Sequence, residues 1–156
     1  MEKEVDHLII NLNGNDPELV KFITQIKNLD LLMNYPWSDN NWSSLHESQH
    51  YWLSLLILED QVRAFSLFSR IGDELHLLKI LVDPACQGVG LGKKLLKVDF
   101  DEHFIDWESC FLEVREDNFS AIKLYSNLGF KLLHKVNSFY SDGCTALKMS
   151  LTYSNS

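Results

Sequence analysis

The segment VDPACQGVGLGKKLL, residues 82–96, carries glycines at three alternate positions, Gly88, Gly90 and Gly92. Glycine lets a backbone approach a ligand closely, and the free N–H groups at the start of a helix bind oxyanions. The segment stands between an apolar run and a helical pattern that contains lysines. It therefore predicts a phosphate-binding loop that would suit a diphosphate. The alternative is a glycine-rich turn that binds no ligand.

Two common phosphate-binding motifs do not fit this spacing. The dinucleotide fingerprint needs G-x-G-x-x-G, whereas the loop reads G-x-G-x-G, and no acidic residue closes a following strand to bind a ribose. The P-loop of nucleoside triphosphatases needs Ser or Thr after its lysine, but Lys93 is followed by Lys94. The spacing therefore disfavours a dinucleotide, ATP and GTP as ligands.

The hydrophobic pattern predicts the elements that must position this loop. Helical spacing and capping signals predict helices over 17–29, from Ser38, over 91–100 and over 117–130. Apolar runs predict strands over 6–12, 51–59, 61–71, 74–82, 110–114, 131–140 and 145–151. A helix joins the strands at 74–82 and 110–114, and such a crossover connects parallel strands. We therefore expect an α/β (α+β) fold with one mixed, mostly antiparallel central sheet of about seven strands and four helices.

Composition limits the class of protein. The chain has 156 residues, of which 46% are hydrophobic, and this is enough for a single globular domain over 1–156 without disulfides. A formal charge of -8 opposes binding to nucleic acid. No export signal or membrane-spanning run is apparent, and the three cysteines lack a CxxC pair. The six histidines form no plausible ligand set. We therefore expect a cytoplasmic protein that binds no nucleic acid, membrane or metal.

The glycine loop resembles the acetyl-CoA motif of the GNAT superfamily of N-acetyltransferases, Q/R-x-x-G-x-G/A, through Gln87, Gly90 and Gly92. A second block, FLEVREDNFSAIKLYSNLGF at 111–130, is similar to the second GNAT signature, and in particular to its RimI group, which acetylates protein N-terminal amines. The tripeptide PWS at 36–38 is a third element similar to that group. The resemblance implies the GNAT fold, with its four helices on the two faces of the sheet.

The resemblance also implies acetyl-CoA as the cosubstrate. The cofactor-binding residues would be Ile80, Leu81 and Val82 on the strand, Gln87, Gly88, Val89, Gly90, Leu91, Gly92 and Lys93 in the loop, and Asn118 at the later helix start. The strand backbone would contact the acetyl and pantetheine parts, and the loop N–H groups would hold the pyrophosphate. From its position alone, Asn118 could equally cap the helix.

By the same resemblance Glu113 is the proton acceptor and Tyr125 the proton donor of acetyl transfer. Partial burial in an apolar strand would raise the pKa of Glu113, and a phenol can protonate the leaving thiolate. An α-amino group, with a pKa of about 8 against about 10.4 for lysine, costs roughly 3 kcal/mol less to deprotonate. From pattern alone, Glu113 could instead be an outward-facing strand charge and Tyr125 a core residue.

Pro36, Trp37 and Tyr140 fall in segments that line the acceptor site in this superfamily. Here the chain departs from the RimI pattern, because Leu29 occupies a column that is acidic in that group and Asp30 stands next to it. We expect an acetyl-CoA-dependent N-acetyltransferase that acts on a protein N-terminus, by resemblance that of a ribosomal protein, through direct attack in a ternary complex. A GNAT enzyme for a small amine or a lysine side chain, and a non-catalytic acyl-CoA sensor or interaction module, remain open, as does the oligomeric state.

Two further patterns receive no catalytic role. The acidic stretch DFDEHFIDWE, residues 99–108, is expected to be a solvated helix end, or else a surface that attracts a basic substrate. No Ser-His-Asp grouping is visible in the sequence, so acyl transfer through a serine is not expected.

Overall fold

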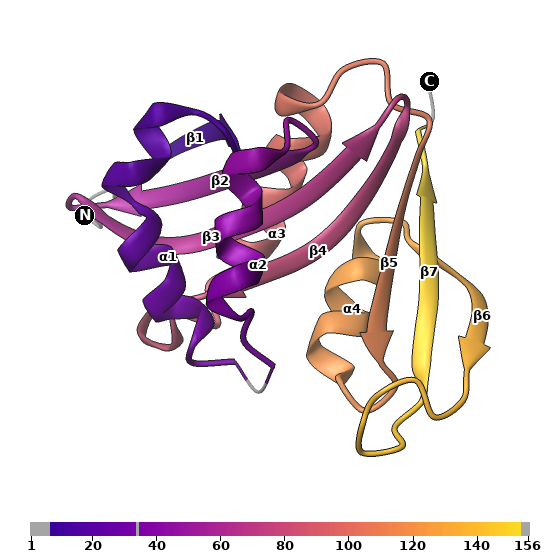
Figure 1. The fold of residues 1–156 in the computed structure, drawn as a ribbon. Coiled ribbons are helices and arrows are strands. Elements are labelled where there is room, and N and C mark those ends of the chain that lie inside the picture. Colours follow the sequence, from indigo (N-terminus) through magenta and orange to yellow (C-terminus); the bar gives the residue numbers. More distant parts are fainter. Residues whose placement is uncertain (1–6, 34, 154–156) are drawn as a thin grey trace, which may run out of the picture.

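The fold is described from a computed structural model, which covers residues 7–33 and 35–153. Within them, seven strands form one sheet in the order β1-β2-β3-β4-β5-β7-β6 (Figure 1). The strands are β1 (Leu8–Asn13), β2 (Tyr51–Leu58), β3 (Gln61–Ile71), β4 (Glu74–Val82), β5 (Ser109–Arg115), β6 (Lys131–Val136) and β7 (Ala146–Thr152). Neighbouring strands are antiparallel apart from β4 and β5, which are parallel. The predicted mixed, mostly antiparallel sheet is confirmed.

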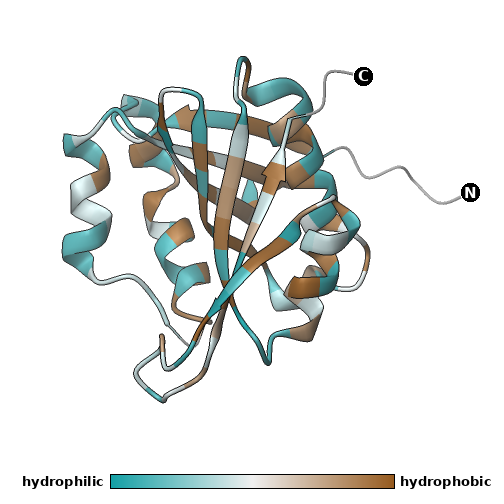
Figure 2. Cartoon of the chain, turned by 90° about the vertical axis from the view of Figure 1, so that its right-hand side faces the viewer, coloured by the Kyte–Doolittle hydropathy of each residue, from teal (hydrophilic) through white to brown (hydrophobic). Residues whose placement is uncertain are grey.

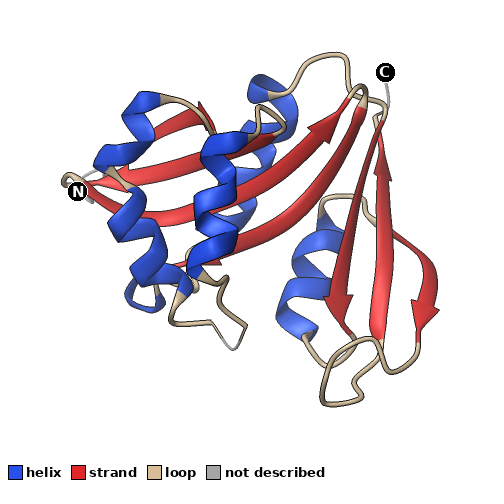
Figure 3. Ribbon diagram, in the orientation of Figure 1, coloured by secondary structure: helices blue, strands red, loops and turns tan. Residues whose placement is uncertain are grey.

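Four α-helices in the described part of the chain cover the two faces of this sheet (Figure 3). The helices α1 (Ile23–Asp30) and α2 (Asp39–Ser44) pack on one face, and α3 (Leu91–Val98) and α4 (Phe119–Asn127) pack on the other. In Figure 2 hydrophobic and hydrophilic residues alternate along each helix. No described helix combines the length and the apolarity that crossing a bilayer requires.

Strand alternation produces the two packed faces. On β2, Leu53, Leu55 and Ile57 belong to the core under α1 and α2, whereas Leu56 between them packs with α3. All four side chains are buried. Both faces of the central strands are therefore covered, and this explains the near-continuous apolar runs in the sequence.

β4 and β5 pair only where they begin. Their parallel ladder spans three residues of each strand, starting at Glu74 and at Ser109. Leu78 then forms a bulge in the pairing of β4 with β3, and β4 and β5 diverge (Figure 1). From Leu77 to Val82, β4 has a strand partner among the described residues only on its β3 side. Its other backbone edge is therefore available to a ligand.

Two predicted helices differ from the structure at one end. The predicted helix at 17–29 begins with a 3-10 turn, Pro17–Lys21, because the N–H groups of Leu19 and Phe22 bond three residues back. The predicted helix at 91–100 becomes a π turn at Asp99–His103.

The ends of the predicted strands also need correction. The strand predicted at 131–140 ends at Val136, and Ser138, with φ +52°, turns the chain. The first residue of the strand predicted at 6–12 lies outside the described residues, as does residue 34 in the turn before Ser38.

The acidic stretch at 99–108 begins in the core and not in solvent. Asp99 is fully buried, and its carboxylate accepts hydrogen bonds from Ser54 Oγ and from Ser66 Oγ (2.6 Å). His103 Nδ1 lies 2.8 Å from the same carboxylate and 3.0 Å from Ser54 Oγ. The solvated helix end is therefore wrong for Asp99, and the fold assembles a Ser-His-Asp grouping that the sequence did not reveal. Because Ser54 is fully buried and bonded to the carboxylate itself, the grouping is a structural network.

Candidate active site

The glycine loop leads from the free part of β4 into α3. Gly88 (φ +86°) and Gly90 (φ +82°) have left-handed backbone conformations that residues with a Cβ rarely adopt. Nothing lies within 4 Å of the place where a Cβ would stand on either glycine, so the backbone is open there. Gly90 begins α3 without a side-chain cap, which leaves the first helical N–H groups for a ligand. This donor set fits an anion such as a pyrophosphate.

Other residues predicted for the loop hold it in place. Gln87 Nε2 donates to the carbonyl oxygen of Val82 (3.0 Å), which ties the loop to the end of β4. A Cβ on Gly92 would stand 3.6 Å from the side chains of Val82 and Leu124, so α3 begins close to β4 and α4. Val89 is 74% exposed beside these residues. The remaining predicted residues are half-buried on β4 (Ile80, Leu81), buried in α3 (Leu91) or exposed in α3 (Lys93).

Asp83 braces the same loop, a role that the sequence analysis did not assign. Its carboxylate accepts hydrogen bonds from Ala85 N (3.0 Å) and from Arg63 Nη1 (3.0 Å). These two bonds, with the backbone donor contributing most, hold the pKa of Asp83 below its ordinary value. Asp83 therefore remains ionised and fixes the turn that precedes the glycines.

The two predicted catalytic residues come from β5 and α4. Glu113 is exposed, so its predicted partial burial is wrong; its neighbours Leu112 and Val114 face the core, and alternation turns Glu113 outward. Tyr125 is only 7% exposed and packs against Phe130, with the ring centroids 5.8 Å apart. Burial raises the pKa of Tyr125, so its phenol is protonated at neutral pH.

Like Tyr125, Tyr140 is a predicted residue whose surroundings raise its pKa. It lies on the β6–β7 loop (residues 137–145), and its own burial raises its pKa, with the Glu113 carboxylate as a further cause and Arg115 acting against both. Tyr140 in turn contributes to the raised pKa of Tyr125, after burial and Cys110. Leu112 and Val114, which flank Glu113 on β5, belong to the same core cluster as Tyr125, so Glu113 itself lies on the other face of this strand.

Asn118 lies at the start of α4. Its Oδ1 accepts a hydrogen bond from Ala121 N (3.2 Å), so it caps α4, and this alternative is confirmed. It also lines an open pocket of about 560 Å³ together with Tyr35, Arg115, Asp117 and Asp142. Capping and contact with a ligand are therefore compatible at this residue.

The α1–α2 loop, described at residues 31–33 and 35–38, carries Pro36 and Trp37. Pro36 is exposed. The ring of Trp37 packs against Trp42 and Tyr51, with centroids 5.1 Å and 6.2 Å away. The backbone N–H of Trp37 donates to Asp30 Oδ2 (2.7 Å). These contacts join Trp37 to the core under α1 and α2, so the residue anchors the loop.

A buried ion pair, which the sequence analysis missed, holds the junction of this loop with α1. We call this junction the root of the loop. Lys79 Nζ lies 2.7 Å from Asp30 Oδ1, with the two side chains 7% and 1% exposed. Lys79 Nζ also donates to the carbonyl oxygen of Tyr35 (3.3 Å) and stands 5.7 Å from the centroid of the Trp37 ring. Asp30 is the acid next to the column that departs from the RimI pattern, and the structure gives it an anchoring role.

Arg115 joins the tip of the loop to the β6–β7 loop. Its Nη1 donates to Tyr35 Oη (2.8 Å), and its Nη2 donates to Asp142 Oδ2 (2.7 Å). The sequence analysis quoted Arg115 within a motif and gave it no role. Contacts that span 80 and 27 positions of the chain have no local signal by which to find them.

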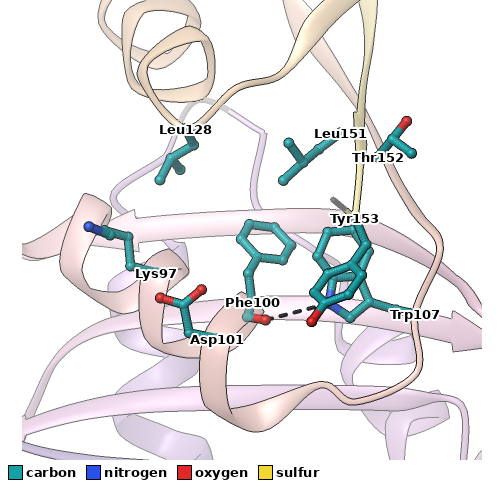
Figure 4. Close-up of a pocket in the computed structure, with 8 residues that line it drawn as sticks. All are labelled: Lys97, Phe100, Asp101, Trp107, Leu128, Leu151, Thr152 and Tyr153. Atoms are coloured by element: carbon teal, nitrogen blue, oxygen red, sulfur yellow. Dashed lines mark hydrogen bonds between the residues drawn. The ribbon is translucent and has the colours of Figure 1, made fainter. Parts of the chain in front are cut away.

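A second pocket, of about 210 Å³, is lined by a different set of residues (Figure 4). Phe100, Trp107 and Tyr153 form its aromatic wall, and Lys97 and Asp101 line it beside them. None of the residues predicted for the site lines it. Among the described residues, no three His, Cys, Asp or Glu side chains form a group that could hold a metal ion.

Comparison of the sequence with known proteins identifies relatives. The model of the acetyltransferase (GNAT) family matches residues 19–130. The ribosomal protein bS18-alanine N-acetyltransferase of Salmonella typhimurium is 36% identical over 102 residues, which cover 62% of this chain and 65% of that protein. The protein of the same name from Escherichia coli K12 gives the same values. The match thus spans slightly less than two thirds of the length of these relatives.

Comparison of the structure gives the same picture. The crystal structure of the ribosomal-protein-S18-alanine N-acetyltransferase from Escherichia coli has a TM-score of 0.82 and 28% identity, and the match covers 97% of this chain and 96% of that one. A GNAT family acetyltransferase from Elizabethkingia anophelis, solved with acetyl-CoA bound, has a TM-score of 0.73 and 15% identity, with 94% and 98% covered. At that identity the second likeness concerns the fold alone.

Proposed function

Because the chain belongs to the acetyltransferase (GNAT) family, we propose that it transfers an acetyl group from acetyl-CoA to the α-amino group of a protein N-terminus. The observation that carries this proposal is the end of β4, where an edge freed by the divergence of β5 leads into a glycine loop with uncapped amides. The names of the relatives, ribosomal protein bS18-alanine N-acetyltransferases, support an N-terminal alanine of a ribosomal protein as the acceptor.

Acetyl-CoA supplies a thioester carbonyl that is activated toward attack by an amine. The N–H groups from Gly88 to Lys93 would hold its pyrophosphate at the start of α3. The free edge of β4 at Ile80, Leu81 and Val82 would hydrogen-bond its amide groups. While Asn118 Oδ1 caps α4, its side-chain NH₂ group can donate to the same ligand.

Glu113 would accept the proton that the attacking amine gives up. As the amine nitrogen bonds to the carbonyl carbon, its surplus proton must leave, and the Glu113 carboxylate takes it directly or through water. Glu113 is exposed, so the site adds no deep burial to strengthen it as a base. This favours an α-amino acceptor, which costs roughly 3 kcal/mol less to deprotonate than a lysine.

Tyr125 would serve the leaving sulfur. When the carbon–sulfur bond breaks, negative charge develops on a thiolate whose ordinary pKa is about 8.5. The buried phenol of Tyr125 is protonated, so it can donate a hydrogen bond to this sulfur and pass its proton as the bond breaks. Water then returns a proton from Glu113 to Tyr125, which restores both groups for the next turnover.

Release of free CoA thiol tests the proposal directly. The pure protein is incubated with acetyl-CoA and one acceptor at a time: a peptide with the N-terminal sequence of ribosomal protein bS18, a blocked peptide with one internal lysine, or a polyamine. We expect turnover with the free N-terminus above the other two. Turnover on polyamines alone would contradict the N-terminal acceptor, and thermal stabilisation by acetyl-CoA without any turnover would contradict an enzyme.

Two substitutions test the assigned roles. Glu113→Gln and Tyr125→Phe should each lower kcat by about a hundredfold to ten-thousandfold, with the affinity for acetyl-CoA retained. Glu116→Gln is the matched control. Glu116 directly follows β5, and its carboxylate oxygen Oε2 lies 3.9 Å from Lys135 Nζ. Loss of acetyl-CoA binding in both catalytic variants would show that the roles are wrongly assigned.

A further inference from the structure

Arg115 has five N–H donors, and protein atoms occupy all of them. Nε donates to Asp117 Oδ1 (3.1 Å) and Nη2 to Asp117 Oδ2 (3.3 Å). Nη1 donates to Tyr35 Oη (2.8 Å) and Asp142 Oδ1 (3.2 Å), and Nη2 also donates to Asp142 Oδ2 (2.7 Å). A guanidinium with its donors taken up in this way holds its partners in place and has none left for a ligand anion.

Apart from Asp117, which follows β5 directly, the partners of Arg115 come from two loops that are distant in the sequence. Tyr35 belongs to the α1–α2 loop, and Tyr140 and Asp142 belong to the β6–β7 loop. The rings of Tyr35 and Tyr140 stack with centroids 6.1 Å apart, and Arg115 Cζ stands 5.4 Å and 4.9 Å from them. We call these four residues, Tyr35, Arg115, Tyr140 and Asp142, the clasp.

The clasp lies beside the proposed base. Glu113 and Arg115 are two residues apart on β5, so they share one face of the strand. Tyr35, Arg115 and Asp142 line the open pocket of about 560 Å³ that also reaches Asn118. Three of the four clasp residues therefore line this pocket, and Glu113 stands two residues before Arg115 on the same face of β5.

The charge around Arg115 favours a cationic acceptor. Arg115 contributes one positive charge, and its partners Asp117 and Asp142 contribute two negative ones. The Asp142 carboxylate is ionised above its pKa of about 2, which the hydrogen bonds from Arg115 and Cys144 N lower. These three groups together carry one negative charge, which attracts an ammonium group, and Lys148, opposite Glu113 in the β5–β7 register, adds a positive charge to the face of Glu113.

We propose that Arg115 is a positioning residue for the acceptor: by fixing the two loops beside Glu113 it selects an extended peptide over a small free amine. The inference rests on the proposed function, because it assigns the acceptor side of the same site. A peptide that enters the pocket lined by Tyr35 and Asp142 would contact both loops, so its binding would depend on their separation. A small amine reaches Glu113 without such contacts and should be nearly indifferent to the clasp.

Steady-state kinetics of three variants test this role. Arg115→Lys keeps the positive charge and loses the planar guanidinium, which bonds several partners at once. Tyr35→Phe removes only the hydroxyl that is bonded to Arg115 and Asp142. Arg70→Lys is the matched control, because Arg70 bonds the carbonyl oxygens of Gly72 (2.8 Å) and Ile105 (2.7 Å) at the opposite end of the sheet.

We expect Arg115→Lys to raise KM for the acceptor peptide by about tenfold to a hundredfold. KM for acetyl-CoA, and turnover at saturating peptide, should change by less than about twofold, because the variant leaves acetyl-CoA binding and the proton transfers intact. KM for a polyamine should not rise. Tyr35→Phe should act in the same direction and more weakly, and Arg70→Lys should match the wild type. An unchanged peptide KM in both clasp variants, or an equal rise for the polyamine, would overturn the inference.

Hydrogen exchange gives a readout that needs no activity. In Arg115→Lys the segments that contain Tyr35 and Asp142 should exchange faster together, and in Arg70→Lys they should not. If the wild type acetylates no amine, the proposed function fails, and the affinity of the bS18 peptide in the presence of CoA then decides the inference. Equal peptide affinity in the wild type and in Arg115→Lys would overturn it, and weaker binding in the variant would support it.

Discussion

Asp30 and Lys79 pair in the interior, Arg115 and Asp142 pair at the surface, and both pairs hold the α1–α2 loop. The nitrogen–oxygen distance is 2.7 Å in each. The side chains of Asp30 and Lys79 are 1% and 7% exposed, whereas those of Asp142 and Arg115 are 48% and 19% exposed. Equal distances therefore conceal unequal energetics, because water competes for the exposed pair and is excluded from the buried one.

The difference in exposure implies different roles for the two pairs: the buried pair stabilises the fold, and the exposed pair positions the loop for the proposed acceptor. The buried pair anchors the root of the loop, since Asp30 also binds Trp37 N and Lys79 also binds the carbonyl oxygen of Tyr35. The clasp holds the tip and adds little to stability, because exposed ion pairs are screened. We infer that the root determines whether the loop is folded, and the tip determines where it stands relative to Glu113.

The largest expected effect comes from breaking the buried pair. Lys79→Met leaves Asp30 buried without its cation, and we expect the free energy of unfolding to fall by about 3–5 kcal/mol, measured by urea denaturation. The double variant Asp30→Leu with Lys79→Met should recover much of that loss, because an apolar pair of similar volume is often no less stable. Arg115→Met is the matched removal of the exposed cation. If it costs as much as Lys79→Met, the contrast between the two pairs is wrong.

A smaller effect is expected at Asp99, a buried carboxylate without a lysine or arginine partner. Asp99→Asn keeps the shape and weakens the bonds from Ser54, Ser66 and His103. It also relieves the burial of a charge, so we expect a loss of about 1–3 kcal/mol by the same urea assay. A loss above that of Lys79→Met would mean that hydroxyl donors stabilise a buried carboxylate better than an ammonium does.

Much of the fold could be predicted, because local sequence patterns determine where its helices and strands lie. Apolar runs located the strands, Asp16 and Asn118 cap the helical segments that begin after them, and Gly129 (φ +101°) follows the end of α4. The π turn after Val98 could not be foreseen, because it places Asp99 against hydroxyls of β2 and β3 that lie far away in the sequence.

The candidate site likewise has one part that the local sequence predicts and another part that only the folded chain reveals. The glycine loop is a continuous segment, so its left-handed glycines and uncapped helix start follow from its own sequence. The exposure of Glu113 follows from alternation, which the sequence analysis had kept as an alternative. The clasp joins Tyr35 to Asp142 across 107 positions, and only the folded chain makes such a contact visible.

A higher salt concentration should weaken the exposed ion pair and leave the buried one unchanged. Raising NaCl from 0.1 M to 1 M shortens the Debye length from about 10 Å to about 3 Å, so exposed charges lose most of their attraction. The rate of amide hydrogen exchange should rise in segments that contain Tyr35 and Asp142, and it should stay constant in segments that contain Asp30 and Lys79. Potassium chloride at the same concentration serves as the control for ion identity. Equal acceleration in both regions would show that the root is not shielded from solvent.

The smallest effect is expected from pH, and its direction follows from the clasp itself. Arg115 and the backbone donor Cys144 N lower the pKa of Asp142 to about 2, and Asp142 and Asp117 raise the pKa of Arg115 further above its ordinary value. A carboxylate with a lowered pKa contributes its stabilisation fully above its ordinary pKa and loses it as the pH falls toward about 2. Both partners therefore keep their charges between pH 5 and pH 9, and the ion pair of Arg115 with Asp142 should not titrate there.

The pH dependence of kcat/KM for the acceptor peptide should accordingly report the amine and the proton-transfer groups alone. Asp142→Asn should lower kcat/KM at every pH by a constant factor, so that its profile runs parallel to that of the wild type when log kcat/KM is plotted from pH 5 to pH 9. An inflection that disappears in Asp142→Asn would mean that the exposed pair changes its charge in this range. The clasp would then be a pH-dependent element and no longer the fixed counterpart of the buried pair.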